Sequence, residues 1–263
     1  MRAYWAVVSA RFRMLLQYRA AALAGFGTQV FWGLIRVMIF DAFYRSTNAP
    51  QPMTYEDVVT YVWLGQAFLV LILWGVESDI RQMIRSGTVA YELLRPLDLY
   101  TFWFSRSLAT RSAPMLLRAV PMFVVAGLCF GMRPPPSLAF AVLWVIATVG
   151  ALFLACALTT LLSISLFWTI SGEGLARIVP SLVAILSGMI VPLPLFPDWA
   201  RDALDFLPFR GLVDVPFRIY LGHIPLEEIA PLLFHQAMWT AAIVLLGRWM
   251  LARGARRLVV QGG

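Results

Sequence analysis

The sequence predicts an all-α integral membrane protein whose chain crosses the bilayer six times. Hydrophobic residues make up 60% of the 263 residues and charged residues only 13%, and the mean hydropathy is +0.77. An ordinary soluble domain carries about 25% charged residues. The apolar residues gather in runs near the roughly 20 residues that a helix needs to cross about 30 Å of hydrocarbon. We therefore expect one transmembrane domain over residues 1–263, without a separate soluble domain.

The chain begins with an amphipathic helix over residues 2–19, within a predicted interfacial segment 1–20. Trp5, Val8, Phe12 and Leu15 recur at helical spacing, and polar residues fall elsewhere on the helix. This pattern is typical of a helix that lies on the membrane surface. The alternative is a cytoplasmic tail that merely precedes the first crossing.

Six apolar runs follow, and the distribution of arginine orients them. The runs cover residues 22–43, 57–77, 112–131, 138–166, 177–196 and 229–251. An even number of crossings puts both termini on one side. Of the 21 basic residues, fifteen fall in segments on the side of the termini, five on the opposite side and one inside the first run. Because cytoplasmic loops are enriched in Lys and Arg, both termini are predicted to be cytoplasmic.

Two of the runs have features of their own. Pro114 and Pro121 lie within the third run and are expected to bend it. The fourth run is longer than a bilayer crossing requires, so it should tilt or extend into the cytoplasm as far as Phe167 and Trp168.

An Arg-rich segment, predicted over residues 78–100, lies between the second and third runs. Its sequence from Glu77 to Asp98 is polar and helical in character, and it includes Arg81 and Arg85. Since Arg is favoured on the cytoplasmic side, we expect this segment to face inward and to dock a soluble partner.

A second unusual segment, residues 192–228, connects the fifth and sixth runs. Its prolines predict short, bent helices at or dipping into the outer leaflet. Asp198, Asp202 and Asp205 share one helical face. Three carboxylates are compatible with acid catalysis or a cation site, but both usually need further converging groups, and a solvated face is the simpler interpretation.

The composition excludes several functions. All 21 basic residues are Arg, so the chain has no Lys with which to build the phosphate-binding loop of a nucleotide hydrolase. Any ATP-driven work must be done by a partner. The net charge of +7 is explained by membrane orientation and anionic headgroups rather than by nucleic acid.

Few residues suggest chemistry within the membrane. Cys129 and Cys156 fall in apolar runs and are expected to pack there, and with only His223 and His235 we expect no metal site and no catalytic residue. Arg36 is an intramembrane charge and hence a functional candidate, although it also lies near enough to the outer end of its run to reach the interface.

The order of these elements resembles the permease subunit of ATP-binding-cassette (ABC) exporters of the type-2 class, bacterial branch. The matching residues span nearly the whole chain: Ile84, Gly87, Leu94-Arg-Pro-Leu97, Phe167-Trp168, Gly172, Ser187-Gly188, Pro192, Phe196-Pro197, Trp199, Leu207-Pro208-Phe209, Pro216 and Gly222.

The resemblance implies a bacterial inner-membrane protein that works with partners. Two copies of a cytoplasmic ABC ATPase bind ATP and Mg²⁺, so this chain needs no cofactor of its own and is not an enzyme. A second permease, identical or a sister chain, completes the path within the membrane lipids.

The resemblance also implies two sets of site residues. A coupling helix after the second crossing contacts the ATPase through a set that we carry over as Asp79, Arg81, Arg85, Gly87, Glu92, Arg95 and Pro96. A re-entrant extracytoplasmic segment contains Pro192, Phe196, Pro197, Trp199, Pro208 and Phe209. Gly87 is expected to end the coupling helix and Pro96 to set the turn toward the third crossing.

The predicted function is therefore ATP-driven export. A path with few charges suits an amphipathic, lipid-like or drug-like substrate. Two alternatives are an intramembrane enzyme that acts on lipid-linked substrates and an ion-driven secondary transporter. The first needs clustered Asp, His or Ser, and the second usually places carboxylates at mid-membrane, whereas Glu77, Asp79 and Glu173 lie at predicted cytoplasmic ends.

Overall fold

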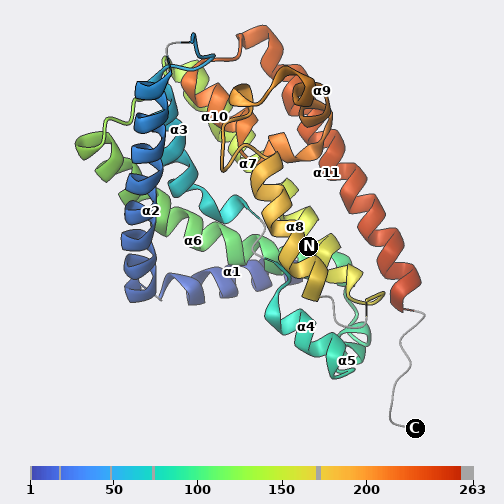
Figure 1. Cartoon of the computed structure of the whole chain (residues 1–263). Helices are drawn as coiled ribbons and strands as arrows, with labels where there is room; N and C mark the ends of the chain where they lie inside the picture. Colours follow the sequence, from blue (N-terminus) through green and yellow to red (C-terminus); the bar gives the residue numbers. More distant parts are fainter. Residues whose placement is uncertain (1, 18, 48, 73–74, 170–172, 256–263) are drawn as a thin grey trace.

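A computed structural model describes residues 2–17, 19–47, 49–72, 75–169 and 173–255, and every regular element in these ranges is a helix (Figure 1). In chain order they are α1 (Arg2–Leu16), α2 (Arg19–Ser46), α3 (Tyr55–Ala67), η1 (Leu69–Leu71), α4 (Ser78–Arg85), α5 (Val89–Leu93), α6 (Leu99–Cys129), α7 (Leu138–Ser165), α8 (Glu173–Leu186), η2 (Leu193–Leu195), α9 (Asp198–Phe206), η3 (Pro208–Leu212), α10 (Asp214–Leu221) and α11 (Leu226–Gly254).

Four of the described helices are long and apolar enough to cross a membrane. They are α6, α7, α11 and the part of α2 from Ala24 to Ser46. The second and fifth predicted crossings contain shorter helices: α3 has 13 residues and α8 has 14. At about 1.5 Å per residue, each covers only about 20 Å. The all-helical membrane class is confirmed, whereas six crossings stay a prediction.

The third crossing begins earlier than the apolar run 112–131 indicated. Helix α6 starts at Leu99, after Asp98, whose side chain accepts a hydrogen bond from the backbone N–H of Thr101 at 2.9 Å. The buried Arg106 and Arg111 interrupt the apolar pattern of this first part, which is why hydropathy missed it. The helix continues through both internal prolines.

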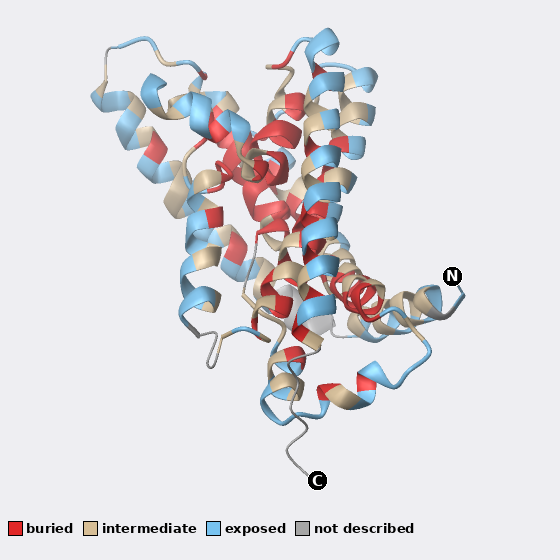
Figure 2. Ribbon diagram, turned by 90° about the vertical axis from the view of Figure 1, so that its right-hand side faces the viewer, coloured by how far each residue is buried: buried red, intermediate tan, exposed pale blue. Residues whose placement is uncertain are grey.

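The core is built around α3. All residues from Val58 to Ala67 are buried, and the Trp63 ring stacks on Phe130 with 4.7 Å between centroids. Thr54 and Asp57 form a reciprocal capping box that starts the helix. Helices α2, α6 and α10 pack against α3, so the buried residues form a band through the middle of the molecule (Figure 2).

The two ends of the molecule carry different short helices. Helix α1 lies across the lower end of α2 and packs along α6, while α4 and α5 project below them (Figure 1). Helices α9 and α10 lie at the opposite end, where α10 packs against α3 and α9 lies beside α11. We call residues 77–98 the α4–α5 lobe and residues 192–222 the α9–α10 hairpin.

Candidate functional site

The α4–α5 lobe consists of two short helices joined by a glycine turn. Helix α4 ends at Arg85, and Gly87 follows with φ of +73°, a conformation that glycine adopts without steric cost. Gly87 therefore stands where a helix-ending residue was expected. Pro96 lies between the end of α5 and Asp98, the residue that caps α6.

Arg106 of α6 attaches the lobe to the rest of the molecule. Its side chain is buried, and its guanidinium lies 3.1 Å from Asp79 Oδ2, 3.4 Å from Glu92 Oε1 and 3.9 Å from Glu77 Oε2. Trp103 donates a hydrogen bond from Nε1 to Glu92 Oε2 at 2.7 Å. Because a buried carboxylate without a partner is costly, this network holds α5 against α6.

Helix α1 contributes to the same attachment. Arg11 lies 3.3 Å from Asp79 Oδ2, and the Tyr4 hydroxyl accepts a hydrogen bond from the backbone N–H of Asp98 at 2.9 Å. The first helix thus contacts both ends of the lobe.

The structure divides the predicted coupling residues into two groups. Asp79 and Glu92 face Arg106, so within this chain they serve as attachment points. Arg85, Gly87, Arg95 and Pro96 are exposed, and Arg81 is half-buried with no side-chain hydrogen bond or ion pair to another described residue.

The predicted coupling set left out two apolar side chains on the lobe surface: Tyr91, and Leu94, which was noted only for the family resemblance. Tyr91 is 71% exposed and Leu94 is 80% exposed. Tyr91 stands next to Glu92 and Leu94 next to Arg95, but most residues of this stretch are apolar, so the sequence carries no signal that separates these exposed side chains from the buried ones. Together with the neighbouring Arg residues they form an apolar surface with a basic border.

The α9–α10 hairpin contains the other predicted set. Pro192 precedes η2, Phe196 and Pro197 connect it to α9, and Pro208 begins η3, followed by Phe209. Trp199 is 85% exposed on α9. The Phe206 ring meets Trp239 of α11 edge-on at 5.7 Å.

The predicted acidic face of α9 is partly neutralised by arginine. Asp198 pairs with Arg201 at 2.8 Å and Asp205 with Arg210 at 2.5 Å, while Asp202 is exposed. Within the described part of the chain, no three His, Cys, Asp or Glu residues come together as potential metal ligands. The carboxylates therefore take part in ion pairs with neighbouring arginines.

Arg36 connects α2 to the turn after α8. Its guanidinium donates hydrogen bonds to the carbonyl oxygens of Met189 and, at 2.7 Å, of Ile190. Gly188, with φ of +86°, makes this turn possible. A cavity of about 360 Å³ lies beside Arg36, and most of its lining is apolar, including Phe40, Phe43 and Val191.

Comparison with protein families matches residues 30–262 to a family described as "ABC-2 family transporter protein". The match includes both the α4–α5 lobe and the α9–α10 hairpin, and it confirms the resemblance drawn from the sequence. A comparison with curated proteins found no match.

Proposed function

The chain belongs to the ABC-2 family of transporter proteins, and from this membership we propose that it is the permease subunit of an ATP-driven exporter. This chain has no Lys for a phosphate-binding loop, so ATP and Mg²⁺ are bound by a separate cytoplasmic ATPase. Two copies of that ATPase work with the permeases. Each subunit crosses the bacterial inner membrane six times. A second permease, identical or a sister chain, completes the transport path between the two subunits.

The surface of the α4–α5 lobe is the observation that supports ATPase docking. Tyr91 and Leu94 are exposed at an end of the molecule that extends beyond the long helices (Figure 1). Exposed aromatic and aliphatic side chains with a polar rim are typical of protein interfaces. Arg81 has donors available for an acidic partner, and Arg106 holds the lobe so that a displacement of the lobe moves α6 as well.

The side on which the lobe lies follows from charge. The positive-inside tendency places the Arg-rich lobe and both termini in the cytoplasm, which is where a soluble ATPase is available. The α9–α10 hairpin then faces the exterior.

The apolar surfaces support an amphipathic or lipid-like cargo. The cavity beside Arg36 is lined mainly by apolar side chains, and α2 exposes Phe31, Met38 and Ile39. A second permease requires an apolar face of this kind to pack against. The cargo path requires one too, and it disfavours a hydrophilic ion, which apolar side chains stabilise poorly.

Co-purification with the ATPase subunit tests this function. We expect the double variant Arg81→Glu, Leu94→Asp to reduce ATPase binding at least about tenfold, because it removes an apolar anchor and introduces like-charge repulsion. Arg45→Glu is the matched control, since the Arg45 side chain is 79% exposed at the C-terminal end of α2, away from the lobe. The proposed docking site is wrong if the double variant retains the ATPase with unaltered turnover.

Vesicle transport assays test the cargo class separately. The proposal expects uptake of amphipathic compounds that depends on ATP and on the ATPase subunit. A strict preference for a small hydrophilic ion would contradict it.

A further inference from the structure

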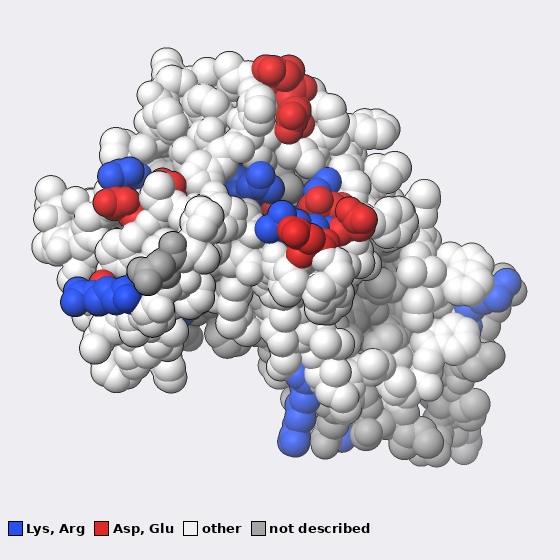
Figure 3. Space-filling model, turned by 45° about the horizontal axis from the view of Figure 1, so that its top comes forward, with Lys and Arg blue, Asp and Glu red and all other residues white. Residues whose placement is uncertain are grey.

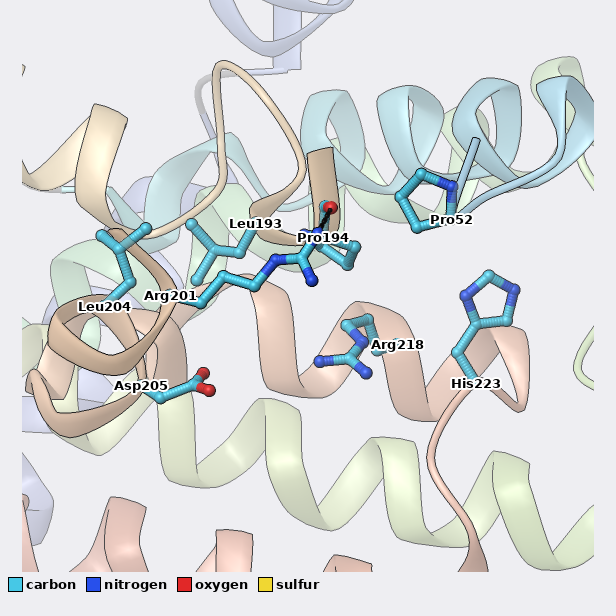
Figure 4. Close-up of a pocket in the computed structure, with 8 residues that line it drawn as sticks. All are labelled: Pro52, Leu193, Pro194, Arg201, Leu204, Asp205, Arg218 and His223. Atoms are coloured by element: carbon cyan, nitrogen blue, oxygen red, sulfur yellow. Dashed lines mark hydrogen bonds between the residues drawn. The ribbon is translucent and has the colours of Figure 1, made fainter. Parts of the chain in front are cut away.

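An open cavity of about 540 Å³ lies between the α9–α10 hairpin and Pro52, at the end of the molecule opposite the lobe (Figure 4). Arg201 of α9 and Arg218 of α10 approach it from two sides, with Asp205 and His223 at its edges. In the surface view, basic and acidic side chains gather on this end of the molecule (Figure 3). A cavity of this volume is within the range of small-molecule sites.

The two arginines facing this cavity are paired with different acids. Arg201 Nη1 lies 2.8 Å from Asp198, and Nη2 donates to the Pro194 carbonyl oxygen at 3.0 Å. Arg218 Nη1 lies 3.5 Å from Asp214. Among the described residues, no carboxylate pairs with both guanidinium groups. An anion placed between Arg201 and Arg218 would interact with both.

Arg218 is the less fully neutralised of the two. Its 3.5 Å separation from Asp214 is longer than the roughly 2.7–2.9 Å of a strong charge-assisted hydrogen bond. Its Nε is buried without a partner among the described residues. Burial raises the pKa of the Asp214 carboxyl to about 6, opposed by the neighbouring Arg218. The Arg218 side chain is 31% exposed, so the donor that a ligand can reach is Nη2 rather than the buried Nε.

The other charged groups at the cavity are engaged elsewhere. Asp205 lies 2.5 Å from Arg210, and His223 Nε2 lies 3.1 Å from Asp57 Oδ2. Asp205 would repel an anion bound near it, but its pairing with Arg210 reduces that repulsion. Arg201 and Arg218 are thus the two arginines that line the cavity itself.

Phosphate suits two neighbouring guanidinium groups, because its oxygens can accept a charge-assisted hydrogen bond from each. The surroundings favour a lipid as its source. Trp199 and Phe206 are exposed on α9, and exposed aromatic side chains are enriched at the level of the lipid headgroups. The cavity also exceeds what a single phosphate ion fills.

We infer that the cavity between α9 and α10 binds the phosphodiester of a lipid headgroup through Arg201 and Arg218. This site goes beyond the proposed docking of an ATPase and does not depend on it.

Calorimetric titration of the purified full chain in detergent tests the inference without any ATPase. The probes are dihexanoyl phosphatidylglycerol below its micelle concentration, inorganic phosphate, and dihexanoyl glycerol, which has no phosphate. We expect the phosphatidylglycerol to bind and its affinity to fall with added salt. Arg201→Gln should weaken binding about tenfold, as expected for loss of a charge-assisted hydrogen bond. Adding Arg218→Gln should abolish it.

Arg45→Gln is the matched control and should bind as the unaltered chain does. Arg201 is partly exposed, so Arg201→Gln is expected to fold, and an unchanged unfolding temperature without ligand verifies this. Equal binding of inorganic phosphate would overturn a lipid as the source, and equal binding of dihexanoyl glycerol would overturn the role of phosphate. If the unaltered chain binds no phosphatidylglycerol, or if Arg201→Gln binds it as well as the control, the inferred site is wrong.

Discussion

Arginine side chains inside this protein donate hydrogen bonds to backbone carbonyl oxygens that have no partner where a helix ends. Arg111 of α6 donates to the carbonyl oxygens of Val70 and, at 3.1 Å, of Ile72, and to Thr159 Oγ1 at 2.5 Å. The last carbonyls of a helix lack intrahelical partners and are costly to bury without others. Arg111 thus stabilises the break after η1, as Arg36 does for the turn after α8.

Replacing Arg111 tests this role. Arg111→Met leaves buried carbonyl oxygens without donors, at about 1–3 kcal/mol each, and should lower the thermal unfolding temperature in detergent by about 5 °C or more. Arg45→Met, at an exposed Arg on α2, should change it little. An unaltered unfolding temperature for Arg111→Met would show that the break is stabilised by other means.

At the scale of elements, the α4–α5 lobe is a pair of short helices whose position depends on α6. Helices of eight and five residues are too short to be stable alone in water, so tertiary contacts must hold them. The contacts come from Arg106 and Trp103, which both reach Glu92. The lobe is therefore a candidate for a unit that moves together with α6.

Removing Arg106 should release the lobe. Arg106→Gln leaves the buried Glu92 carboxylate without its cation, a situation that costs about 3–5 kcal/mol. We expect hydrogen exchange at the amides of residues 80–93 to accelerate at least tenfold, while exchange in α7 stays the same. Arg81→Gln serves as the control, because the Arg81 side chain makes no hydrogen bond or ion pair with another described residue, whereas Arg95 lies over the Phe102 ring of α6. Equal protection in both variants would show that Arg106 does not hold the lobe.

At the scale of the whole molecule, the two ends have different chemistry. The lobe end carries α1 and the exposed Arg85 and Arg95, whereas the opposite end carries the paired charges of the α9–α10 hairpin (Figures 1 and 3). Four of the described helices, each long and apolar enough to cross a bilayer, separate the two ends. The proposed export function requires such a separation, because it assigns the ATPase to one end and the exit to the other.

Cysteine labelling in intact cells tests this orientation. In a Cys129→Ser, Cys156→Ala background, an impermeant maleimide should label Asp202→Cys of α9 from outside, and should label Ser86→Cys only after the membrane is permeabilised. Both positions are exposed, so access depends on the side of the membrane. Labelling of Ser86→Cys in intact cells would place the lobe outside and remove the basis of the proposed ATPase docking.

Much of the candidate site could be located from the sequence. Which of its residues attach the lobe to α6 and which are exposed could not. The charged segment after the second run and the proline-rich segment after the fifth stand out, because both interrupt apolar runs. Glu92 was expected to face a partner, yet it is buried against Arg106, fourteen residues further along the chain. Tyr91 and Leu94 were not predicted to contact the ATPase, because exposure is a property of the folded chain.

The sequence by itself determined that this protein is helical and belongs in a membrane, because its apolar runs have about the length with which a helix crosses lipid while satisfying its own backbone hydrogen bonds. Its arginine distribution also predicted which end faces inward. Only the tertiary structure decided where helices break and which charges are used internally. Those outcomes depend on contacts between distant residues, such as Arg36 with Ile190 and Arg111 with Ile72, that hydropathy and helical periodicity do not contain.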